Sequence, residues 1–190
     1  MKRSKVLIIV LVFGFLFVSN TYTYGQKFYI GAKMGLSLQD VNFPGLTIEY
    51  KPESSTVFGF QIGMKIENFM VEASYYQADH LLNEEETPPP EFDFERFKLN
   101  YFGLNIKYFL QIPVVQPFLT AGYGSYKIDL VGFDKDRSGG FNVGLGASVQ
   151  VTKYISFSVE GKYHRVSFEL VQEKMNVNDF VWNVSFNFHF

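Results

Sequence analysis

The sequence predicts an all-β protein, namely an eight-stranded antiparallel up-and-down transmembrane β-barrel. Three observations support this fold class. Large apolar residues alternate with small or polar residues in eight separate segments, which is the pattern of strands that have one apolar face. No segment after residue 26 keeps an apolar period of 3.6 residues. The connections between the eight segments alternate between long and short, as in a meander of hairpins.

The N-terminus has the composition of a secretory signal peptide. It opens with three basic residues, namely Lys2, Arg3 and Lys5. An apolar run over residues 6–18 follows, shorter than the roughly 20 residues that a membrane-spanning helix needs. We therefore expect a signal peptide at residues 1–25, cleaved after Gly25, and a barrel domain at residues 26–190.

The first four expected strands are joined by one tight turn and two long connections. Residues 67–68 form the turn, and in a two-residue hairpin the flanking Ile66 and Phe69 lie on the same face of the sheet. The apolar face therefore continues without a change of register. The four segments are "FYIGAKMGLS" (28–37), "VFGFQIGMKI" (57–66), "FMVEASYYQ" (69–77) and "YFGLNIKYFL" (101–110).

The last four expected strands complete the barrel. In the fifth, we expect Leu119, Ala121 and Tyr123 to face outward and Gly122 and Gly124 inward. The eighth strand pairs with the first, so that no strand edge is left open. The four segments are "FLTAGYGSYKIDL" (118–130), "FNVGLGASVQV" (141–151), residues 155–167 and "FVWNVSFNFHF" (180–190).

The connections indicate an orientation. Strands of this length match the roughly 9–11 residues that a tilted strand needs to cross a bilayer, and outer-membrane barrels have short periplasmic turns and longer extracellular loops. We therefore expect a monomer in the outer membrane of a Gram-negative cell, surrounded by lipid, with both termini periplasmic. The long connections are 38–55, 79–96, 132–139 and 168–179, and the short ones are 67–68, 112–117 and 152–154.

Two eight-stranded architectures place the apolar face differently. A soluble lipocalin-like barrel holds it inside, whereas a membrane barrel turns it toward lipid. Here glycines and charged residues share one face, which suits a crowded interior with paired charges, and the first strand lacks the G-x-W segment of lipocalins. We therefore expect the apolar face to contact lipid and the charges to pair inside as a packed core, with no open channel. The predicted lumen charge network is Lys33, Lys65, Glu72, Lys107, Glu160 and Lys162.

Several segments resemble the outer-membrane β-barrel domain family often labelled PorT-like, whose architecture is similar to the small OmpA and OmpX barrels. They are the leader, the first strand, the hairpin "LNYFGLNIKYFLQIPVVQPFLTAGYGSY" and the aromatic C-terminus. "PFLTAGYG" matches the family pattern well, whereas the proline usual in the preceding strand is absent between Gly103 and Ile106. The resemblance implies a fold and a compartment. It also implies that the barrel assembly machinery recognises the terminal strand through Trp182, Phe186, Phe188 and Phe190.

Composition excludes several other classes of function. The net charge of −2 argues against a nucleic-acid-binding surface. The absence of cysteine removes disulfides, thiolate metal sites and a lipid-anchored cysteine. The three histidines, His80 in an outer loop, His164 at the outer end of the seventh strand and His189 at the periplasmic end of the eighth, lack metal-site spacing. We expect no cofactor and no metal.

The function is predicted less sharply than the compartment. We expect a structural or binding role through long extracellular loops, with no catalysis. The loop "DHLLNEEETPPPEFDFERF" offers an acidic surface for Ca²⁺ or an unidentified partner, or is simply a solvated loop; "GFDKDRSGG" is an ordinary polar turn. The candidate loop residues are Glu84, Glu85, Glu86, Glu91, Asp93 and Glu95.

Two alternative functions stay open. "YHRVSFE" supplies His164 and Ser167 for a lipid A-modifying enzyme, but a spacing of three puts them on opposite faces unless the strand ends between them. The resemblance also permits an accessory barrel of a protein secretion machine.

Overall fold

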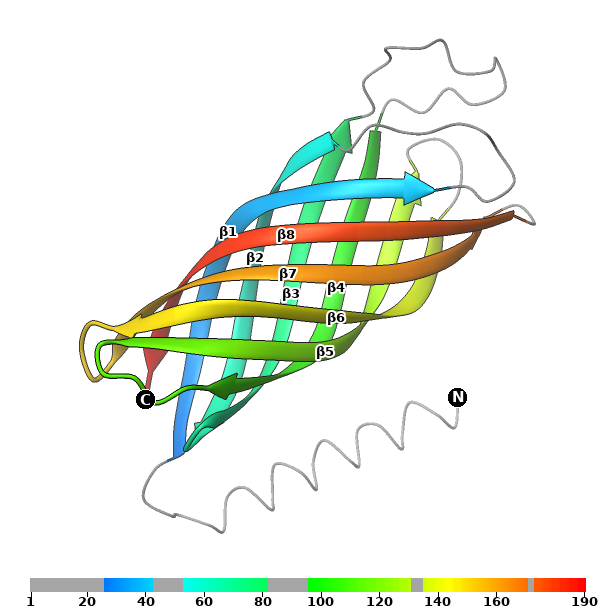
Figure 1. The fold of residues 1–190 in the computed structure, drawn as a ribbon. Helices are drawn as coiled ribbons and strands as arrows, with labels where there is room; N and C mark the ends of the chain where they lie inside the picture. The colour runs from blue at the N-terminus through cyan, green and yellow to red at the C-terminus, as the bar shows by residue number, and fades with distance from the viewer. Residues whose placement is uncertain (1–25, 43–52, 82–95, 131–134, 171–172) are drawn as a thin grey trace.

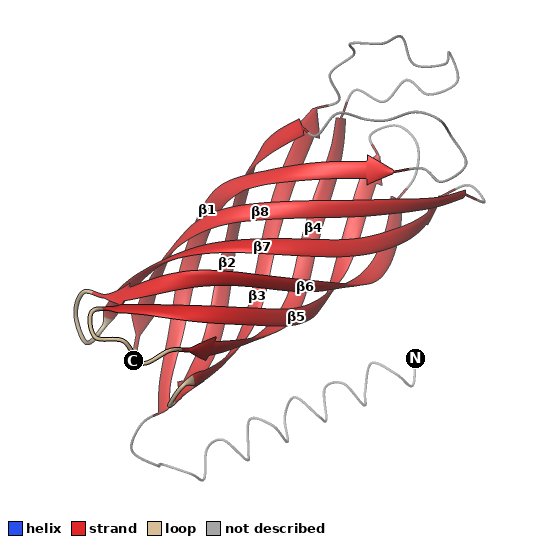
Figure 2. Ribbon diagram, in the orientation of Figure 1, coloured by secondary structure: helices blue, strands red, loops and turns tan. Residues whose placement is uncertain are grey.

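The computed structural model describes residues 26–42, 53–81, 96–130, 135–170 and 173–190, which form one closed barrel. Each strand pairs antiparallel with the next, and β1 also pairs with β8 (Figures 1 and 2). The predicted fold class is confirmed. The strands are β1 (Gln26–Asn42), β2 (Glu53–Ile66), β3 (Phe69–Leu81), β4 (Arg96–Phe109), β5 (Val115–Leu130), β6 (Lys135–Gln150), β7 (Ile155–Leu170) and β8 (Glu173–His189).

One end of the barrel, called the turn end here, carries the turns 67–68, 110–114 and 151–154 together with the C-terminus (Figure 1). Ile66 pairs with Phe69 across the first turn, as predicted. The second turn reverses the chain earlier than expected, at Val114, which has a φ of 74°. Leu110 therefore lies outside β4, and β5 begins at Val115.

The predicted register of β5 is confirmed. Leu119 and Tyr123 are exposed on the outer face, whereas Gly124 is buried in the interior. The sixth strand ends at Gln150, so that Val151 belongs to the turn. Among the described residues, no helix is long and apolar enough to cross a membrane.

The outer surface carries an apolar belt between two rings of aromatic side chains. Leu104 is typical of the belt, with 59% of its surface exposed, an exposure that suits lipid and not water. Near the turn end the ring contains contacting pairs such as Phe69–Tyr108, with centroids 5.1 Å apart. Aromatic rings of this kind mark the two interfaces of a bilayer. The ring near the turn end, called the lower girdle here, comprises Phe28, Phe69, Tyr108, Tyr154, Phe188 and Phe190. The ring farther from the turn end, called the upper girdle here, comprises Tyr75, Tyr123, Phe141, Tyr163, Phe180 and Trp182.

The upper girdle borders polar surface. Tyr75 donates a hydrogen bond from its hydroxyl to Asn100 Oδ1 at 3.0 Å, and Tyr163 donates to Asn178 Oδ1 at 2.7 Å. A tyrosine with its ring on the belt and its hydroxyl bonded to a polar neighbour occupies both sides of an interface. The apolar belt therefore ends at this ring.

Beyond the upper girdle the inward and outward faces of the strands exchange their polarity. This part of the barrel is called the collar here. Outward positions become polar, for example Gln77, Lys98 and Ser167. Inward positions become apolar and form one cluster with neighbouring tyrosines. The collar core consists of Val57, Ala78, Leu99, Ile128, Val166, Phe168 and Val177, each no more than 2% exposed.

The inversion explains why the predicted strands were too short. The sequence pattern was followed only while apolar residues faced outward, so residues beyond the upper girdle were assigned to loops. The structure extends β1 to Asn42 and starts β8 at Glu173, where the predicted strands ended at residue 37 and began at residue 180. The predicted polar turn 132–140 also contributes residues 135–140 to β6. The described strands therefore replace much of the predicted long loops.

The position of the belt can be tested with a single charged substitution on β3. Ala73 faces outward between Ile62 and Leu104, inside the belt, four residues from Phe69 and two from Tyr75 of the two girdles. We expect Ala73→Arg to lower the free energy of unfolding by about 2–4 kcal/mol, because an arginine inside the apolar belt must leave water for lipid. Gln77→Arg, on the same strand and face but in the collar, is expected to cost only about 0–1 kcal/mol. Urea unfolding in lipid vesicles measures both, and equal costs would contradict the assigned boundary.

Candidate functional site: the closed interior

A network of buried charges crosses the lumen within the belt. Lys107 on β4 lies 2.8 Å from Glu72 on β3 and 3.3 Å from Glu160 on β7. Lys162 on β7 lies 3.4 Å from Glu160 and 3.9 Å from Glu72. Since β7 lies across the barrel from β3 and β4, two of these four ion pairs, Lys107–Glu160 and Lys162–Glu72, join opposite walls.

Neighbouring polar groups form further hydrogen bonds with Glu72. Its carboxylate accepts hydrogen bonds from the Tyr29 hydroxyl at 2.6 Å and from Asn105 Nδ2 at 3.4 Å. Room for the network comes partly from Gly144, which faces Lys162 across the β6–β7 pair. A Cβ at residue 144 would lie 2.8 Å from Lys162 Cγ. Partners on all sides are what an interior carboxylate needs, since a buried charge without them is costly.

The structure brings together four of the six residues predicted for this network. Lys33 is buried on β1 and faces the same interior, outside the four ion pairs. Lys65 was expected to pair with the glutamates, and this was wrong. Its Nζ donates to Gln116 Oε1 at 2.7 Å and lies 4.2 Å from the centre of the Phe109 ring. The reason is height along the barrel, because Lys65 is next to last in β2 and therefore lies at the turn end.

A layer of aromatic rings closes the lumen between the network and the collar core. Tyr101 lies between Tyr76 and Tyr126, with both centroid distances at 4.9 Å. The imidazole of His164 packs edge-on against these rings, and its Nδ1 lies 2.6 Å from the Tyr126 hydroxyl. Gly124 provides space, because a Cβ there would overlap the Tyr101 ring. The side chains of Tyr76, Tyr101, Tyr126 and His164 are called the tyrosine layer here.

The tyrosine layer is tied to the collar by Asp179. Tyr76 donates to Asp179 Oδ2 at 3.2 Å, and Ser37 donates to Asp179 Oδ1 at 2.5 Å. The alternation within the predicted strands 69–77 and 101–110 puts Tyr76 and Tyr101 on the inner face but gives no indication of their joint role, and Asp179 fell in the predicted connection 168–179. Tyrosines that alternate with apolar outward residues are the signal that could have predicted this layer.

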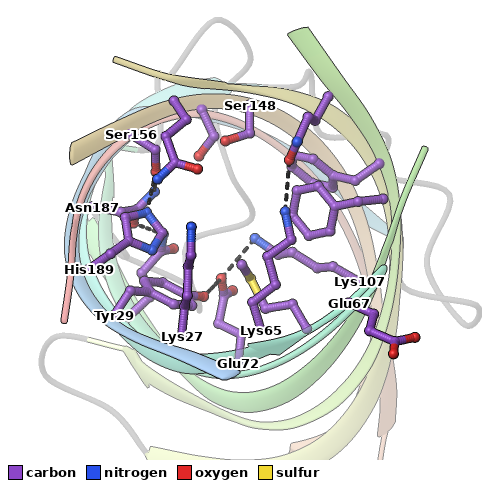
Figure 3. Close-up of a pocket in the computed structure, with 17 residues that line it drawn as sticks. Lys27, Tyr29, Lys65, Glu67, Glu72, Lys107, Ser148, Ser156, Asn187 and His189 are labelled. Carbon is purple, nitrogen blue, oxygen red and sulfur yellow. Dashed lines mark hydrogen bonds and ion pairs between the residues drawn. The ribbon is translucent and has the colours of Figure 1, made fainter. Parts of the chain in front are cut away.

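On the other side of the network, a vestibule of about 200 Å³ opens at the turn end. Figure 3 shows Lys27, Lys65 and Lys107 directed into it, with Glu72 at its base and Glu67 directed away. Its wall is polar, with Gln61 Nε2 donating to Asn187 Oδ1 at 2.7 Å and Ser156 lying 2.8 Å from His189 Nε2. The vestibule therefore ends at the charge network.

The histidines do not form a metal site in the described part of the chain. His164 belongs to the tyrosine layer, deep in the interior, and not to the outer end of its strand as expected. His189 faces the lumen at the turn end. No cluster of three or more potential metal-binding side chains occurs among the described residues; the side chain of His80 lies outside them.

The residues proposed for a lipid A-modifying enzyme are separated by the wall of the barrel. β7 continues past both to Leu170, so His164 faces the interior and Ser167 faces outward. Ser167 donates instead to Asn176 Oδ1 at 2.7 Å. These two side chains therefore cannot act together as nucleophile and base.

The residues predicted as the assembly signal lie on β8 and at the residue that follows it. Trp182, Phe186, Phe188 and Phe190 are exposed on the outer face of the terminal strand and its last residue. Phe190 forms backbone hydrogen bonds with Phe28 and stacks on its ring, with centroids 6.3 Å apart. The acidic residues between positions 84 and 95 lie outside the described residues.

A closed barrel with an apolar belt, two girdles and a charged interior has the features of an outer-membrane protein, and the sequence comparison agrees. The chain matches the family described as outer membrane protein beta-barrel domain over residues 8–190. The chain belongs to this family. Membership supports an outer-membrane location, while the narrower PorT-like label stays a prediction.

Several solved structures are similar to this chain at low sequence identity. The crystal structure of Neisserial surface protein A matches with a TM-score of 0.65 and 18% identity, over 86% of this chain and 97% of that one. The N-terminal barrel of Pseudomonas aeruginosa OprF has a TM-score of 0.49 and 12% identity, over 83% and 97% of the two chains. Ail of Yersinia pestis has a TM-score of 0.44 and 15% identity, over 87% and 100%. A comparison with curated proteins found no match.

Proposed function

We propose that this member of the outer-membrane barrel family is a non-conducting barrel that has a structural or binding role, exercised at its collar. The observation that carries the proposal is the inverted pattern beyond the upper girdle. A polar outer face over an apolar core is the arrangement of a water-soluble barrel. It supports a rigid extension of the strands into water, which is suited to contact with other molecules.

The proposal includes an orientation, with the collar outside the cell and both the turn end and the termini in the periplasm. Short turns are typical of the periplasmic end of such barrels, and the turn end has only short turns, the longest being 110–114. The collar would then present its charged side chains to the exterior, among them Asp79, Lys98 and Arg165. The acidic loop residues remain a prediction for the same surface.

Reconstitution into a planar bilayer tests the closed interior. We expect no step conductance, because the charge network and the tyrosine layer cross the lumen of a barrel whose eight strands leave space only for side chains. The control is a bilayer that receives the same detergent without protein. Reproducible unitary steps that depend on the protein would contradict the proposal and indicate transport.

The structure affects the two alternative functions differently. The lipid A-modifying enzyme loses its candidate pair, because His164 is interior and Ser167 exterior. An accessory role in a secretion machine stays a prediction, as does recognition of the terminal strand by the barrel assembly machinery. Co-purification from outer membranes with the intact chain tests the former.

A further inference from the structure

We propose that the vestibule at the turn end is a binding site for a phosphate group. The first observation is a pair of like charges at its mouth. Lys27 and Lys65 are direct cross-strand partners on the inner face of β1 and β2, and both are directed into the opening (Figure 3). Like charges directly opposite each other destabilise a sheet, so an anion between them would offset their repulsion.

The described residues supply no carboxylate to this pair. Lys65 is held by the amide oxygen of Gln116 and the ring of Phe109, neither of which carries a charge. Glu67 lines the rim of the vestibule, but its carboxylate points away from the two lysines (Figure 3). Glu72 is engaged by Lys107 and Tyr29 deeper in the lumen. Within the described chain, the lysine pair therefore has no counter-charge at ion-pair distance.

The second observation is a pair of buried polar atoms that lack a hydrogen-bond partner in the same wall. They are Gln61 Oε1 and His189 Nδ1, in residues that are 3% and 6% exposed. In each residue the other polar atom is fixed, by Asn187 and by Ser156 respectively. In the tautomer in which Ser156 donates to Nε2, His189 carries its proton on Nδ1 and offers a donor, while Gln61 offers an acceptor.

This set of groups matches hydrogen phosphate. Two ammonium groups and an imidazole N–H can donate to its anionic oxygens, and the Gln61 oxygen can accept from its O–H group. A carboxylate satisfies the donors but leaves Gln61 without a partner, which is costly for a buried polar atom. The vestibule measures about 200 Å³, where a water needs about 10–15 Å³ by the same kind of measure, so a phosphate group and several waters fit.

The test compares urea unfolding of the full barrel in non-ionic detergent, in sodium phosphate and in sodium chloride at equal ionic strength. We expect phosphate to raise the unfolding midpoint of the wild type above its value in chloride, because the ligand binds only the folded state. Lys65→Met is expected to weaken the phosphate affinity roughly tenfold or more, since it removes a charged hydrogen bond. Lys153→Met is the matched control, because Lys153 is exposed at the same end but does not line the vestibule.

The chloride measurements show whether the variants fold. Lys65→Met relieves the repulsion from Lys27, so its midpoint in chloride is expected to equal or exceed that of the wild type. Lys27→Met provides a second variant at an exposed position with the same expected loss of phosphate affinity. An equal unfolding midpoint of the wild type in phosphate and in chloride, or a phosphate effect that both Lys65→Met and Lys27→Met retain, would overturn the proposal.

One further salt and one lipid test the chemistry and the source of the group. Acetate at the same ionic strength is expected to raise the midpoint less than phosphate, and an equal rise would overturn the assignment to phosphate. Micelles that contain a small fraction of phosphatidic acid, with no phosphate in solution, separate a lipid headgroup from a solute. A rise with inorganic phosphate and none with the lipid supports a soluble ligand, and a rise with the lipid alone supports a headgroup.

Discussion

Lys107→Met is expected to lower the free energy of unfolding by about 3–5 kcal/mol, the usual cost of removing one partner of a buried ion pair. Lys107 lies 2.8 Å from Glu72 and 3.3 Å from Glu160, in each case closer than Lys162. Without it, Glu72 and Glu160 would face each other with only Lys162 at ion-pair distance among the described side chains. Urea unfolding in lipid vesicles, followed by tryptophan fluorescence, measures the loss.

Two further variants make this test specific. Lys127→Met, on the outer face of the collar, is expected to change the stability by no more than about 0.5 kcal/mol. Adding Glu160→Gln to Lys107→Met is expected to recover part of the loss, because one unpaired charge disappears while Tyr29 and Asn105 still bond to Glu72. Purely additive costs in the double variant would show that the residues do not act as a network.

Phe168→Ala is expected to cost about 3–5 kcal/mol, the range for truncation of a buried phenylalanine. Phe168 is fully buried inside the collar, in a cluster with Leu99, Val166 and Val177. The loss arises because the alanine leaves a cavity in the core of the part of the barrel that extends beyond the upper girdle. The same unfolding experiment measures it.

The neighbouring Ser167→Ala serves as the matched control. Ser167 faces outward on the same strand and its only described side-chain contact is an exposed hydrogen bond with Asn176, so a change within about 0.5 kcal/mol is expected. If Phe168→Ala cost no more than Ser167→Ala, the collar would lack the packed core that the proposed function requires.

The part of the fold within the belt was predictable from local pattern. Lipid outside and a filled polar interior impose a strict period of two, and residues such as Leu104 and Asn105 obey it. The two-residue hairpin fixed the register of β2 and β3 through Ile66 and Phe69. In the collar, Leu99 and Val177 were missed because their apolar side chains face inward, where the pattern had placed polar ones.

The sequence predicted which residues belong to the candidate site better than it predicted which of them form ion pairs. The pattern correctly turned Glu72, Lys107, Glu160 and Lys162 inward, but it carries no information on height along the barrel. Strand tilt and stagger decide that height, and they separate Lys65 from the glutamates while they bring β3 and β7 into contact across the lumen.

The sequence by itself determined the number of strands, their order and the face that each residue presents in the belt, because these follow from the solvent on each side of a strand. Only the tertiary structure decided which inward side chains meet, where the belt ends and how far the strands extend beyond it. Those features depend on contacts between strands that are distant in the chain. Closure of the barrel determines such contacts, and the local alternation of apolar and polar residues carries no information on them.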